Sequence, residues 1–297
     1  MSYAVGIDVG GSSVKAVAVT PEGDVQSQSN RPFEPTEPLA FARTVRDVLR
    51  EVFALHGEAL EAVGVSAPGL AAKDERSIAF MPGRLGGIEG LDWTDYLGAP
   101  FRVPVLNDAH AALLGEVWQG AAQGVANVFM LTLGTGVGGA AMVDGRLLKG
   151  AIGRAGHLGH ICLDPDGPKD ICNLPGSLEH AIGNYSLTER AQGRFATTHD
   201  LARAVAGGDS FAGEVWDRSV RRLALGVASL INVLDPERVI IGGGIAEAGA
   251  TLLEPLRRHL AEYEWRPGGR SVVLVQPALG EYAGAMGSAW NALQHVP

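Results

Sequence analysis

The stretch Val5-Gly6-Ile7-Asp8-Val9-Gly10-Gly11-Ser12-Ser13-Val14-Lys15-Ala16-Val17-Ala18-Val19 contains two apolar runs that are separated by a short segment of Gly and Ser. This pattern predicts two buried β-strands joined by a tight turn. Glycines in such a turn leave backbone N–H groups accessible to an anion. Asp8 has the oxygen ligands that Mg²⁺ prefers, and Lys15 could approach a phosphate. An ordinary hairpin with a polar tip explains the same residues equally well.

A second glycine-rich loop, Gly134-Thr135-Gly136-Val137-Gly138-Gly139, follows the apolar run 128–133. Its letters match G-x-G-x-x-G, but the dinucleotide-binding fingerprint requires a helix directly after the loop. Here the short apolar run 140–143 and the turn Asp144-Gly145 follow, so the loop joins two strands and the Rossmann interpretation is rejected. A loop of small residues with Thr135 can still wrap the β- and γ-phosphates of a nucleotide. A simple hairpin is the alternative, and the similarity of the two loops weakens it.

Two further strand ends carry candidate functional residues. Gly242-Gly243-Gly244 lies between a predicted strand and a helix, where it could accept a flat ligand or a phosphate, or only allow close packing. Asn107-Asp108 ends one strand and opens a helix. Asp is among the best helix N-caps, which gives a purely structural explanation. The functional explanation is a general base, because phosphoryl transfer from ATP needs a group that takes the proton of the attacking hydroxyl.

Predicted strands and helices alternate along the 297 residues, which indicates the α/β class. Helices are predicted at 39–55, 109–118, 211–234, from 245 and from 282, with further strands at 62–66, 103–106, 239–241 and 272–275. Both halves of the chain open with strand, glycine loop and strand, so we expect two related lobes with a ligand-binding cleft between them. We expect an N-terminal lobe over residues 1–115 and a C-terminal lobe over 116–281. The last helix, about 282–295, is expected to pack back on the first lobe.

The composition limits the possible partners and the compartment. A net charge of -9 disfavours overall attraction to nucleic acid or anionic lipid. The two cysteines, Cys162 and Cys172, cannot form a disulfide framework, which indicates a reducing compartment. The first residues lack the basic region and long apolar core of a signal peptide. We therefore expect a cytoplasmic protein that binds neither nucleic acid nor membrane.

Four potential metal ligands, His157, His160, Cys162 and Cys172, lie close together in the sequence. Structural zinc sites prefer cysteine pairs separated by two to four residues, and the spacing of these two cysteines is much longer. Lone histidines more often make hydrogen bonds within the fold than bind a metal. Zinc is therefore the less favoured interpretation of this cluster.

The order of these motifs resembles that of the ROK (repressor/ORF/kinase) family, which includes bacterial glucokinases, fructokinases and N-acetylhexosamine kinases. The resemblance covers almost the whole chain. Its segments are Asp8 to Lys15, Ser66-Ala67-Pro68-Gly69, Leu106-Asn107-Asp108-Ala109, Gly134 to Gly139, His157-Leu158-Gly159-His160, Leu178-Glu179 and Gly242-Gly243-Gly244. It implies a two-lobed actin-like ATPase (ribonuclease H-like) α/β fold with a central cleft. It also implies ATP-dependent phosphorylation of a sugar hydroxyl, on a hexose, an amino sugar or a related polyol.

The resemblance also implies roles for individual residues. Asp108 matches the catalytic base. The expected sugar contacts are Ser66, Gly69, Asn107, His157, His160 and Glu179. The expected ATP-binding residues are Asp8, Gly10, Gly11, Ser12, Lys15, Gly134, Thr135, Gly136, Gly243 and Gly244, with Mg²⁺ at Asp8. A homo-oligomer, most simply a dimer, is expected on the same ground.

The sequence departs from the family pattern in three respects. His157 stands where the family usually has Glu, and Gly83 stands where many members place a sugar-binding Asn. The family zinc motif C-x-C-G-x-x-G-C-x-E corresponds to residues 170–179, where only Cys172 of the three cysteines remains. We therefore expect no structural zinc, and we expect a sugar or polyol other than glucose to be the best substrate. The alternative is that His157 turns out of the pocket or reproduces the Glu contact through its acceptor nitrogen.

A sugar-sensing regulatory protein of the same fold, without kinase activity, is the alternative function. Family repressors carry a helix-turn-helix domain before the first phosphate motif, which here starts at Val5, so no DNA-binding domain is expected. A chaperone-like or structural ATPase of the same architecture would lack the Asn107-Asp108 pair. The sugar, the hydroxyl and the preferred phosphoryl donor stay open at this point.

Overall fold

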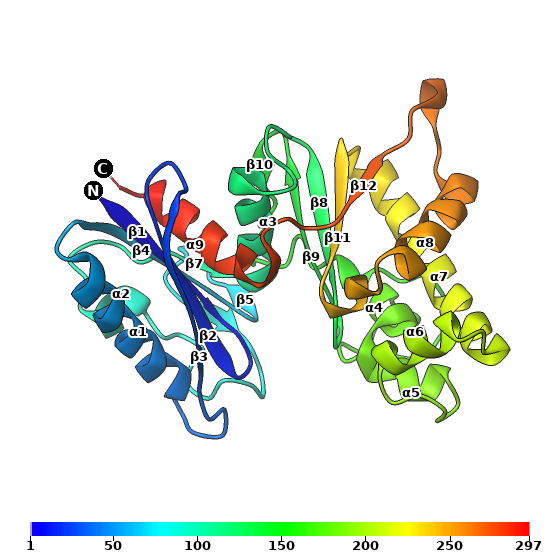
Figure 1. Ribbon diagram of the computed structural model, residues 1–297, viewed down its shortest axis with the longest axis horizontal. Coiled ribbons are helices and arrows are strands. Elements are labelled where there is room, and N and C mark those ends of the chain that lie inside the picture. Colours follow the sequence, from blue (N-terminus) through cyan, green and yellow to red (C-terminus); the bar gives the residue numbers. More distant parts are fainter. Residues whose placement is uncertain (1, 297) are drawn as a thin grey trace. The chain divides into compact units, whose positions relative to one another are not determined.

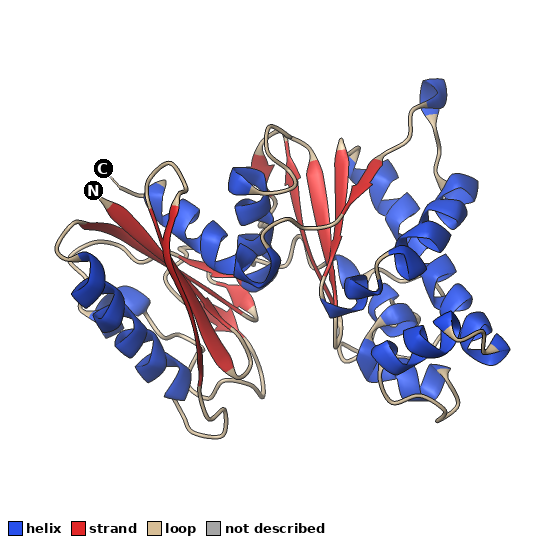
Figure 2. Ribbon diagram, viewed as in Figure 1, coloured by secondary structure: helices blue, strands red, loops and turns tan. Residues whose placement is uncertain are grey.

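The computed structural model describes residues 2–296, which form two compact units (Figure 1). Unit 1 comprises the residues up to Gly124, the segment Leu147–Ala155 and the residues from Pro277 onward. Unit 2 comprises Val125–Arg146 and Gly156–Gln276. Each unit combines a β-sheet with helices, as Figure 2 shows, so the predicted α/β class is confirmed.

The sheet of unit 1 has five strands in the order β3-β2-β1-β4-β7. Their bounds are β1 Tyr3–Val9, β2 Ser13–Val19, β3 Val25–Pro32, β4 Leu60–Ala67 and β7 Val105–Asn107. The central strand β1 pairs antiparallel with β2 and parallel with β4. This register places Asp8 directly between Lys15 on β2 and Ser66 on β4. The sequence motifs around residues 8–15 and 66–69 therefore meet at one end of the sheet.

Both faces of the unit 1 sheet are covered, which explains the continuous apolar character of β1. On one face, Val5 and Ile7 pack with Phe41 and Val45 of helix α1 (Ala40–His56). On the other face, Ala4 packs with residues of helix α9 (Ala283–Leu293). Figure 1 shows these two helices on opposite sides of the blue strands.

Glycines allow α9 to lie against the backbone of the sheet. A Cβ on Gly6 would overlap the carbonyl oxygen of Ala285, and a Cβ on Gly64 would overlap that of Ser288. On its other side α9 packs against helix α3 (Asp108–Gln119), where a Cβ on Gly115 would overlap the carbonyl oxygen of Ala283. The last helix of the chain is thus a central part of unit 1.

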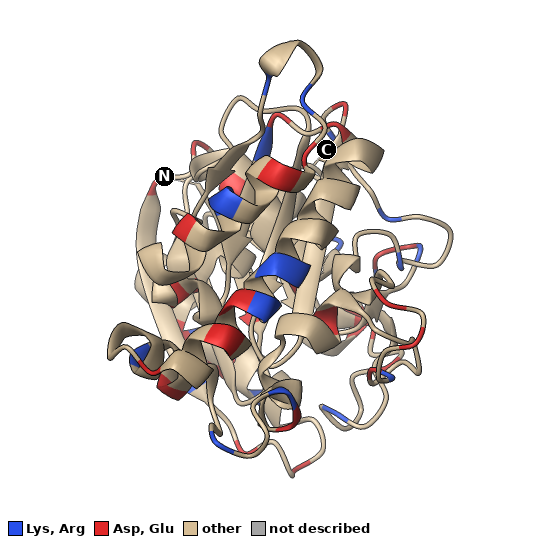
Figure 3. Ribbon diagram, turned by 90° about the vertical axis from the view of Figure 1, so that its right-hand side faces the viewer, with Lys and Arg blue, Asp and Glu red and all other residues tan. Residues whose placement is uncertain are grey.

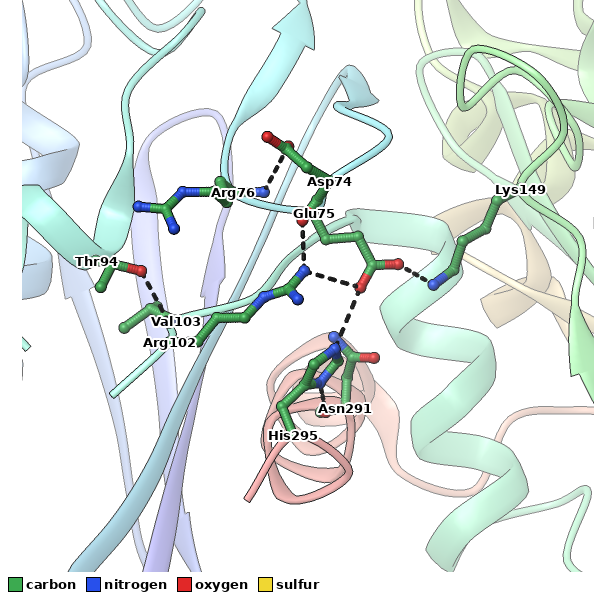
Figure 4. A network of polar contacts seen from close by, with 9 residues as sticks. All are labelled: Asp74, Glu75, Arg76, Thr94, Arg102, Val103, Lys149, Asn291 and His295. Atoms are coloured by element: carbon green, nitrogen blue, oxygen red, sulfur yellow. Dashed lines mark hydrogen bonds and ion pairs between the residues drawn. The ribbon is translucent and has the colours of Figure 1, made fainter. Parts of the chain in front are cut away.

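A buried carboxylate, Glu75, lies beside the C-terminal part of α9 (Figure 4). Its backbone is in the left-handed region, with φ 56°. The carboxylate forms an ion pair with Lys149 and lies 4.0 Å from an Arg102 nitrogen and 3.7 Å from Nε2 of His295. One acidic side chain therefore holds three sequence-distant basic residues of unit 1 together. The remaining elements of this unit are β5 (Leu70–Ala71), β6 (Ile78–Phe80), α2 (Trp93–Leu97) and the 3₁₀ turn η5 (Gly280–Tyr282).

The second sheet has the order β10-β9-β8-β11-β12, with β8 Val128–Leu133, β9 Val137–Val143, β10 Arg146–Leu147, β11 Arg238–Gly242 and β12 Val273–Val275. The first strand of this sheet along the chain, β8, lies at its centre. It pairs antiparallel with β9 and parallel with β11. This is the strand plan of the first sheet, where β1 takes the central place. The repeated strand, glycine loop and strand in the sequence thus corresponds to a repeated sheet topology.

Helical elements complete unit 2: η1 Leu158–His160, α4 Leu178–Ile182, η2 Asn184–Ser186, α5 Leu187–Arg190, α6 Thr198–Ala206, α7 Ser210–Leu234, η3 Gly244–Ala248, α8 Ala250–Tyr263 and η4 Pro267–Gly269. Acidic and basic residues are interspersed on the helices that face the viewer in Figure 3, and Arg258 pairs with Asp217 at 2.7 Å. Among residues 2–296, no helix has the length and apolar character needed to cross a bilayer.

Two predicted element bounds are wrong in detail. The helix expected from residue 245 is first a 3₁₀ turn, and the α-helix begins only at Ala250, after Gly249 with φ 56°. The strand predicted over residues 103–106 is shorter and shifted in the structure, where it covers Val105–Asn107. Pro104 has no N–H to give to a ladder, and only its carbonyl pairs, accepting from Val65 N at 3.0 Å.

Candidate functional site

Asp8 lies at the end of β1 among polar partners that the parallel and antiparallel pairings bring to it. The Ser66 hydroxyl donates to Oδ1 of Asp8 at 2.7 Å. Burial raises the pKa of Asp8 to about 6; the Ser66 hydrogen bond acts in the opposite direction, and the negative charge of Asp108 adds to the rise. Two carboxylates close together and partly buried provide the hard oxygen ligands that suit Mg²⁺.

The residues predicted to surround the sugar in unit 1 are connected by hydrogen bonds. Nδ2 of Asn107 donates to the carbonyl oxygen of Gly69 at 3.0 Å and to Oδ1 of Asp108 at 2.8 Å. Oδ1 of Asn107 accepts from the backbone amides of Ala109 and His110, so Asn107 is the N-cap of α3. The structural explanation offered for Asp108, that it is the N-cap, is therefore wrong: Asp108 is the first helical residue.

A pocket of about 1010 Å³ lies in unit 1. Gly10, Gly11 and Ser12 of the first glycine turn line it, together with Asp108 and the loop from Met81 to Glu89. This loop contains Gly83, which stands where many family members place a sugar-binding Asn, and it also brings Arg84 to the pocket, a residue to which the sequence analysis gave no role. Lys15 is held differently from the expectation, since its Nζ forms an ion pair with Glu281 at 3.2 Å.

In unit 2, Glu179 is almost completely buried at the start of α4. Its Oε2 accepts from the backbone amide of Val137 at 2.9 Å, and its Oε1 has no partner among the described residues. A Cβ on Gly136 would overlap the Glu179 carboxylate. Gly136, predicted as a nucleotide contact, therefore makes room for Glu179. An unpaired buried carboxylate oxygen is costly, and it suits a ligand that brings a hydroxyl donor.

His160 lies in a cluster with Asp170 and Cys172, whose potential ligand atoms are all within 4.8 Å of one another. Nδ1 of His160 is 3.0 Å from Oδ2 of Asp170, and Nε2 is 3.7 Å from Sγ of Cys172. Ser177, at the position of the third family cysteine, is the N-cap of α4 and accepts from the amide of His180 at 3.1 Å. His157 is the residue before the η1 turn and is partly exposed.

A second pocket, of about 540 Å³, lies in unit 2. Three predicted nucleotide residues, Gly134, Thr135 and Gly244, line it. Gly243 does not, because its φ of 84° and its contact with the Leu133 backbone give it a packing role. The sequence motifs missed the other lining residues, which come from η2, from α6 and its N-cap, from η3 and from the start of α8: Asn184, Thr197, Thr198, His199, Ala202, Arg203, Ile245, Glu247, Ala248 and Thr251.

Comparison with known proteins agrees with this fold. A model of the ROK family matches residues 4–295, and the chain therefore belongs to the ROK family. The glucokinase of Halalkalibacterium halodurans is 31% identical over 319 residues, covering 98% of this chain and 94% of that protein. The ROK hexokinase structure from Thermus thermophilus has a TM-score of 0.85 at 30% identity and covers 99% of both chains.

A further similar structure carries ligands. It is a ROK family glucokinase from Streptomyces griseus in complex with glucose and AMPPNP, with a TM-score of 0.78 and 27% identity over 99% of this chain and 100% of that one. These matches confirm both the predicted family and the predicted actin-like ATPase fold.

Proposed function

We propose that this protein is a sugar kinase that transfers the γ-phosphoryl group of ATP to a hydroxyl of a hexose, an amino sugar or a related polyol. The observation that carries the proposal is the pocket of unit 1. There Asp108 and the backbone turn Gly10-Gly11-Ser12 line one space. A carboxylate that can take a proton beside an exposed turn rich in N–H groups is the combination that phosphoryl transfer requires.

In the proposed reaction, the Asp108 carboxylate accepts the proton of the attacking sugar hydroxyl. The hydroxyl oxygen then forms a bond to the γ-phosphorus as the bond between that phosphorus and the bridging oxygen breaks. The products are the sugar phosphate and ADP. Asn107 holds the carboxylate through its 2.8 Å hydrogen bond, so the base stays oriented before the substrate arrives.

Mg²⁺ would be held at Asp8. Burial, together with the negative charge of Asp108, disfavours the ionised form of Asp8, and a bound cation would stabilise that form. A bound Mg²⁺ would supply charge neutralisation for the phosphates. Within the chain, the Ser66 hydroxyl orients Asp8, and the glycine turn offers the amides of Gly11 and Ser12, since the Gly10 amide already donates to the carbonyl oxygen of Ser13 at 2.8 Å. Lys15 would have to leave Glu281 to reach a phosphate.

For unit 2 we propose two groups of contacts. Glu179, His160 and His157 would contact the sugar, and the unpaired Oε1 of Glu179 supports this assignment because it can accept from a hydroxyl. The nucleotide would lie in the pocket lined by Gly134, Thr135 and Gly244. His199 and Arg203 of α6 would lie near the base or ribose in that pocket.

The decisive experiment is a phosphotransfer screen with ATP and Mg²⁺ against hexoses, amino sugars and polyols. We expect stoichiometric ADP and sugar phosphate with at least one substrate, detected by ³¹P NMR. Binding of a sugar without ADP formation would instead support the regulatory alternative. Replacing ATP with GTP or polyphosphate in the same assay tests the choice of donor.

We also propose a cytoplasmic homodimer. Both cysteines are free thiols, which fits a reducing compartment. Light scattering of the purified protein at micromolar concentration would give the oligomeric state directly, and a monomeric mass would contradict the dimer.

A further inference from the structure

The loop from His160 to Ser177 is organised around one carboxylate, that of Asp170. The Asp170 side chain has 0% exposure, although the loop itself lies at the surface. Its Oδ1 accepts from the backbone amides of Cys172 at 2.8 Å and Leu174 at 3.0 Å. Its Oδ2 lies 3.0 Å from Nδ1 of His160. A carboxylate buried without such partners would be strongly destabilising, so these contacts define the loop.

A second branch of contacts runs from Asp170 to α4. Ser177 lies close enough to Asp170 to help lower the pKa of that carboxyl, and its hydroxyl oxygen caps α4 by accepting from His180 N at 3.1 Å. Glu179 is the second residue of this short helix. Asp170 is therefore linked to His160 directly and to Glu179 through Ser177 and the helix N-terminus.

The chemistry of the carboxylate fixes the histidine proton. Burial alone would raise the pKa of Asp170, but hydrogen bonds from His160, the Leu174 amide, Ser177 and the Cys172 amide bring it below its ordinary value. An ionised carboxylate only accepts, so the neutral imidazole must carry its proton on Nδ1. Nε2 is then a lone-pair acceptor. Sγ of Cys172 lies 3.7 Å from Nε2, a long contact that a donor group of the substrate would replace.

We infer that Asp170 is a positioning residue that locks His160 in the Nδ1–H tautomer and so presents Nε2 to the substrate as a hydrogen-bond acceptor. The site would select a ligand group that donates, such as a hydroxyl or an amide N–H. This inference rests on the proposed function only in that His160 contacts the sugar. The same carboxylate organises the loop, because its two oxygens lie within hydrogen-bonding distance of His160 Nδ1 and of the amides of Cys172 and Leu174.

The test is Asp170→Asn. Both backbone amides bond to Oδ1, so the amide oxygen of Asn should stay on that side and Nδ2 should face His160. The NH₂ group would donate to Nδ1 and move the histidine proton to Nε2. ¹⁵N NMR of histidine-labelled protein reports the tautomer, with the His160 signals assigned by their loss in His160→Gln. We expect Nδ1–H in the wild type and Nε2–H in Asp170→Asn.

The kinetic arm uses monodeoxyfluoro analogues of the best sugar, because fluorine keeps a weak acceptor and removes the donor. For one ring position, the wild type should have a KM roughly 10-fold higher for the fluoro sugar than for the parent sugar. A change of this size is expected when one hydrogen bond is lost. In Asp170→Asn this ratio should fall towards 1, with a smaller change in kcat. Asp166→Asn, an exposed acid in the same loop, is the matched control and should leave the ratio unchanged.

The outcomes separate the two proposals. Three results would each overturn the role of Asp170. The first is an Nε2–H tautomer of His160 in the wild type, and the second is stoichiometric zinc in the purified protein. The third is that Asp170→Asn changes neither the tautomer nor the ratio of KM for the fluoro sugar to KM for the parent sugar. If Asp170→Asn does not fold, the wild-type tautomer still decides. If the wild type has the Nδ1–H tautomer but no kinase activity, the role of Asp170 in fixing the His160 tautomer stands and the proposed function is refuted.

Discussion

The side-chain amide of Asn107 donates a 2.8 Å hydrogen bond to Oδ1 of Asp108, while the carbonyl oxygen of the same side chain caps α3. The two neighbouring residues thus have different roles at the start of α3. Asn107 satisfies the first amides of the helix, and Asp108 places a negative charge in the first turn, where the helix dipole stabilises it. Capping and proton acceptance can therefore be tested separately.

The first prediction is that Asp108→Asn lowers kcat by roughly 10²–10⁴, because the amide cannot accept the proton of the sugar hydroxyl. The free energy of unfolding should change by less than about 1 kcal/mol, since the N-cap Asn107 is untouched. Steady-state kinetics and urea unfolding measure the two effects. Asp24→Asn, an exposed acid in a turn of the same unit, is the control. Wild-type turnover in Asp108→Asn would refute its role as the base.

The central strands could be predicted from sequence because their apolar runs are long and end at glycines. The edge strand β3 has mostly exposed residues, and its position follows only from pairing with β2. The N-cap was assigned to the wrong neighbour because Asn and Asp cap about equally well, and geometry decides between them. The link between Asp170 and α4, and the α6 wall of the unit 2 pocket, depend on tertiary contacts that no local motif encodes.

The second prediction concerns pH. The folded protein holds the pKa of Asp8 at about 6, above the value near 4 of an unfolded chain. Between these values the folded state keeps a proton that the unfolded state has lost. The free energy of unfolding should therefore fall as the pH rises from about 4 to about 6, by on the order of 1–3 kcal/mol from this group.

Asp8→Asn should remove this component of the pH dependence. Urea unfolding of both proteins at several pH values between 4 and 7 would show it as a difference in slope. Parallel pH profiles for wild type and variant would contradict the raised pKa.

The third prediction is that glucose is not the best substrate, because His157 replaces an acceptor-only carboxylate with a ring that has one donor and one acceptor. Comparing kcat/KM for glucose, other hexoses, amino sugars and polyols tests it. His157→Glu should shift the ranking towards glucose. If glucose ranks first in the wild type and the substitution changes little, His157 does not set the specificity.

The fourth prediction is that the purified protein contains no stoichiometric zinc. His160, Asp170 and Cys172 supply three candidate ligands where a closed site needs four, and Asp170 is already engaged by several donors. Elemental analysis after purification without chelator measures this. One zinc per chain, with unfolding promoted by its removal, would show that the loop is a metal site after all.

The fifth prediction is that Glu75→Gln destabilises unit 1 by about 1–3 kcal/mol. The substitution removes the negative charge that faces Lys149, Arg102 and His295 and leaves the Lys149 and Arg102 charges without their acidic partner (Figure 4). The adjacent exposed Asp74→Asn serves as the control. Thermal unfolding should show a lower Tm for Glu75→Gln alone, and equal Tm values for both variants would mean that the cluster contributes little.

Because α9 lies against Gly6 and Gly64 in the middle of the first sheet, the order of synthesis differs from the order of folding. Every residue of unit 2 is synthesised before the first residue of α9. One face of the unit 1 sheet, including Ala4, Val17 and Val19, stays uncovered until the last residues emerge. An incomplete chain without α9 therefore exposes an apolar strand surface, the kind of surface that promotes aggregation during folding.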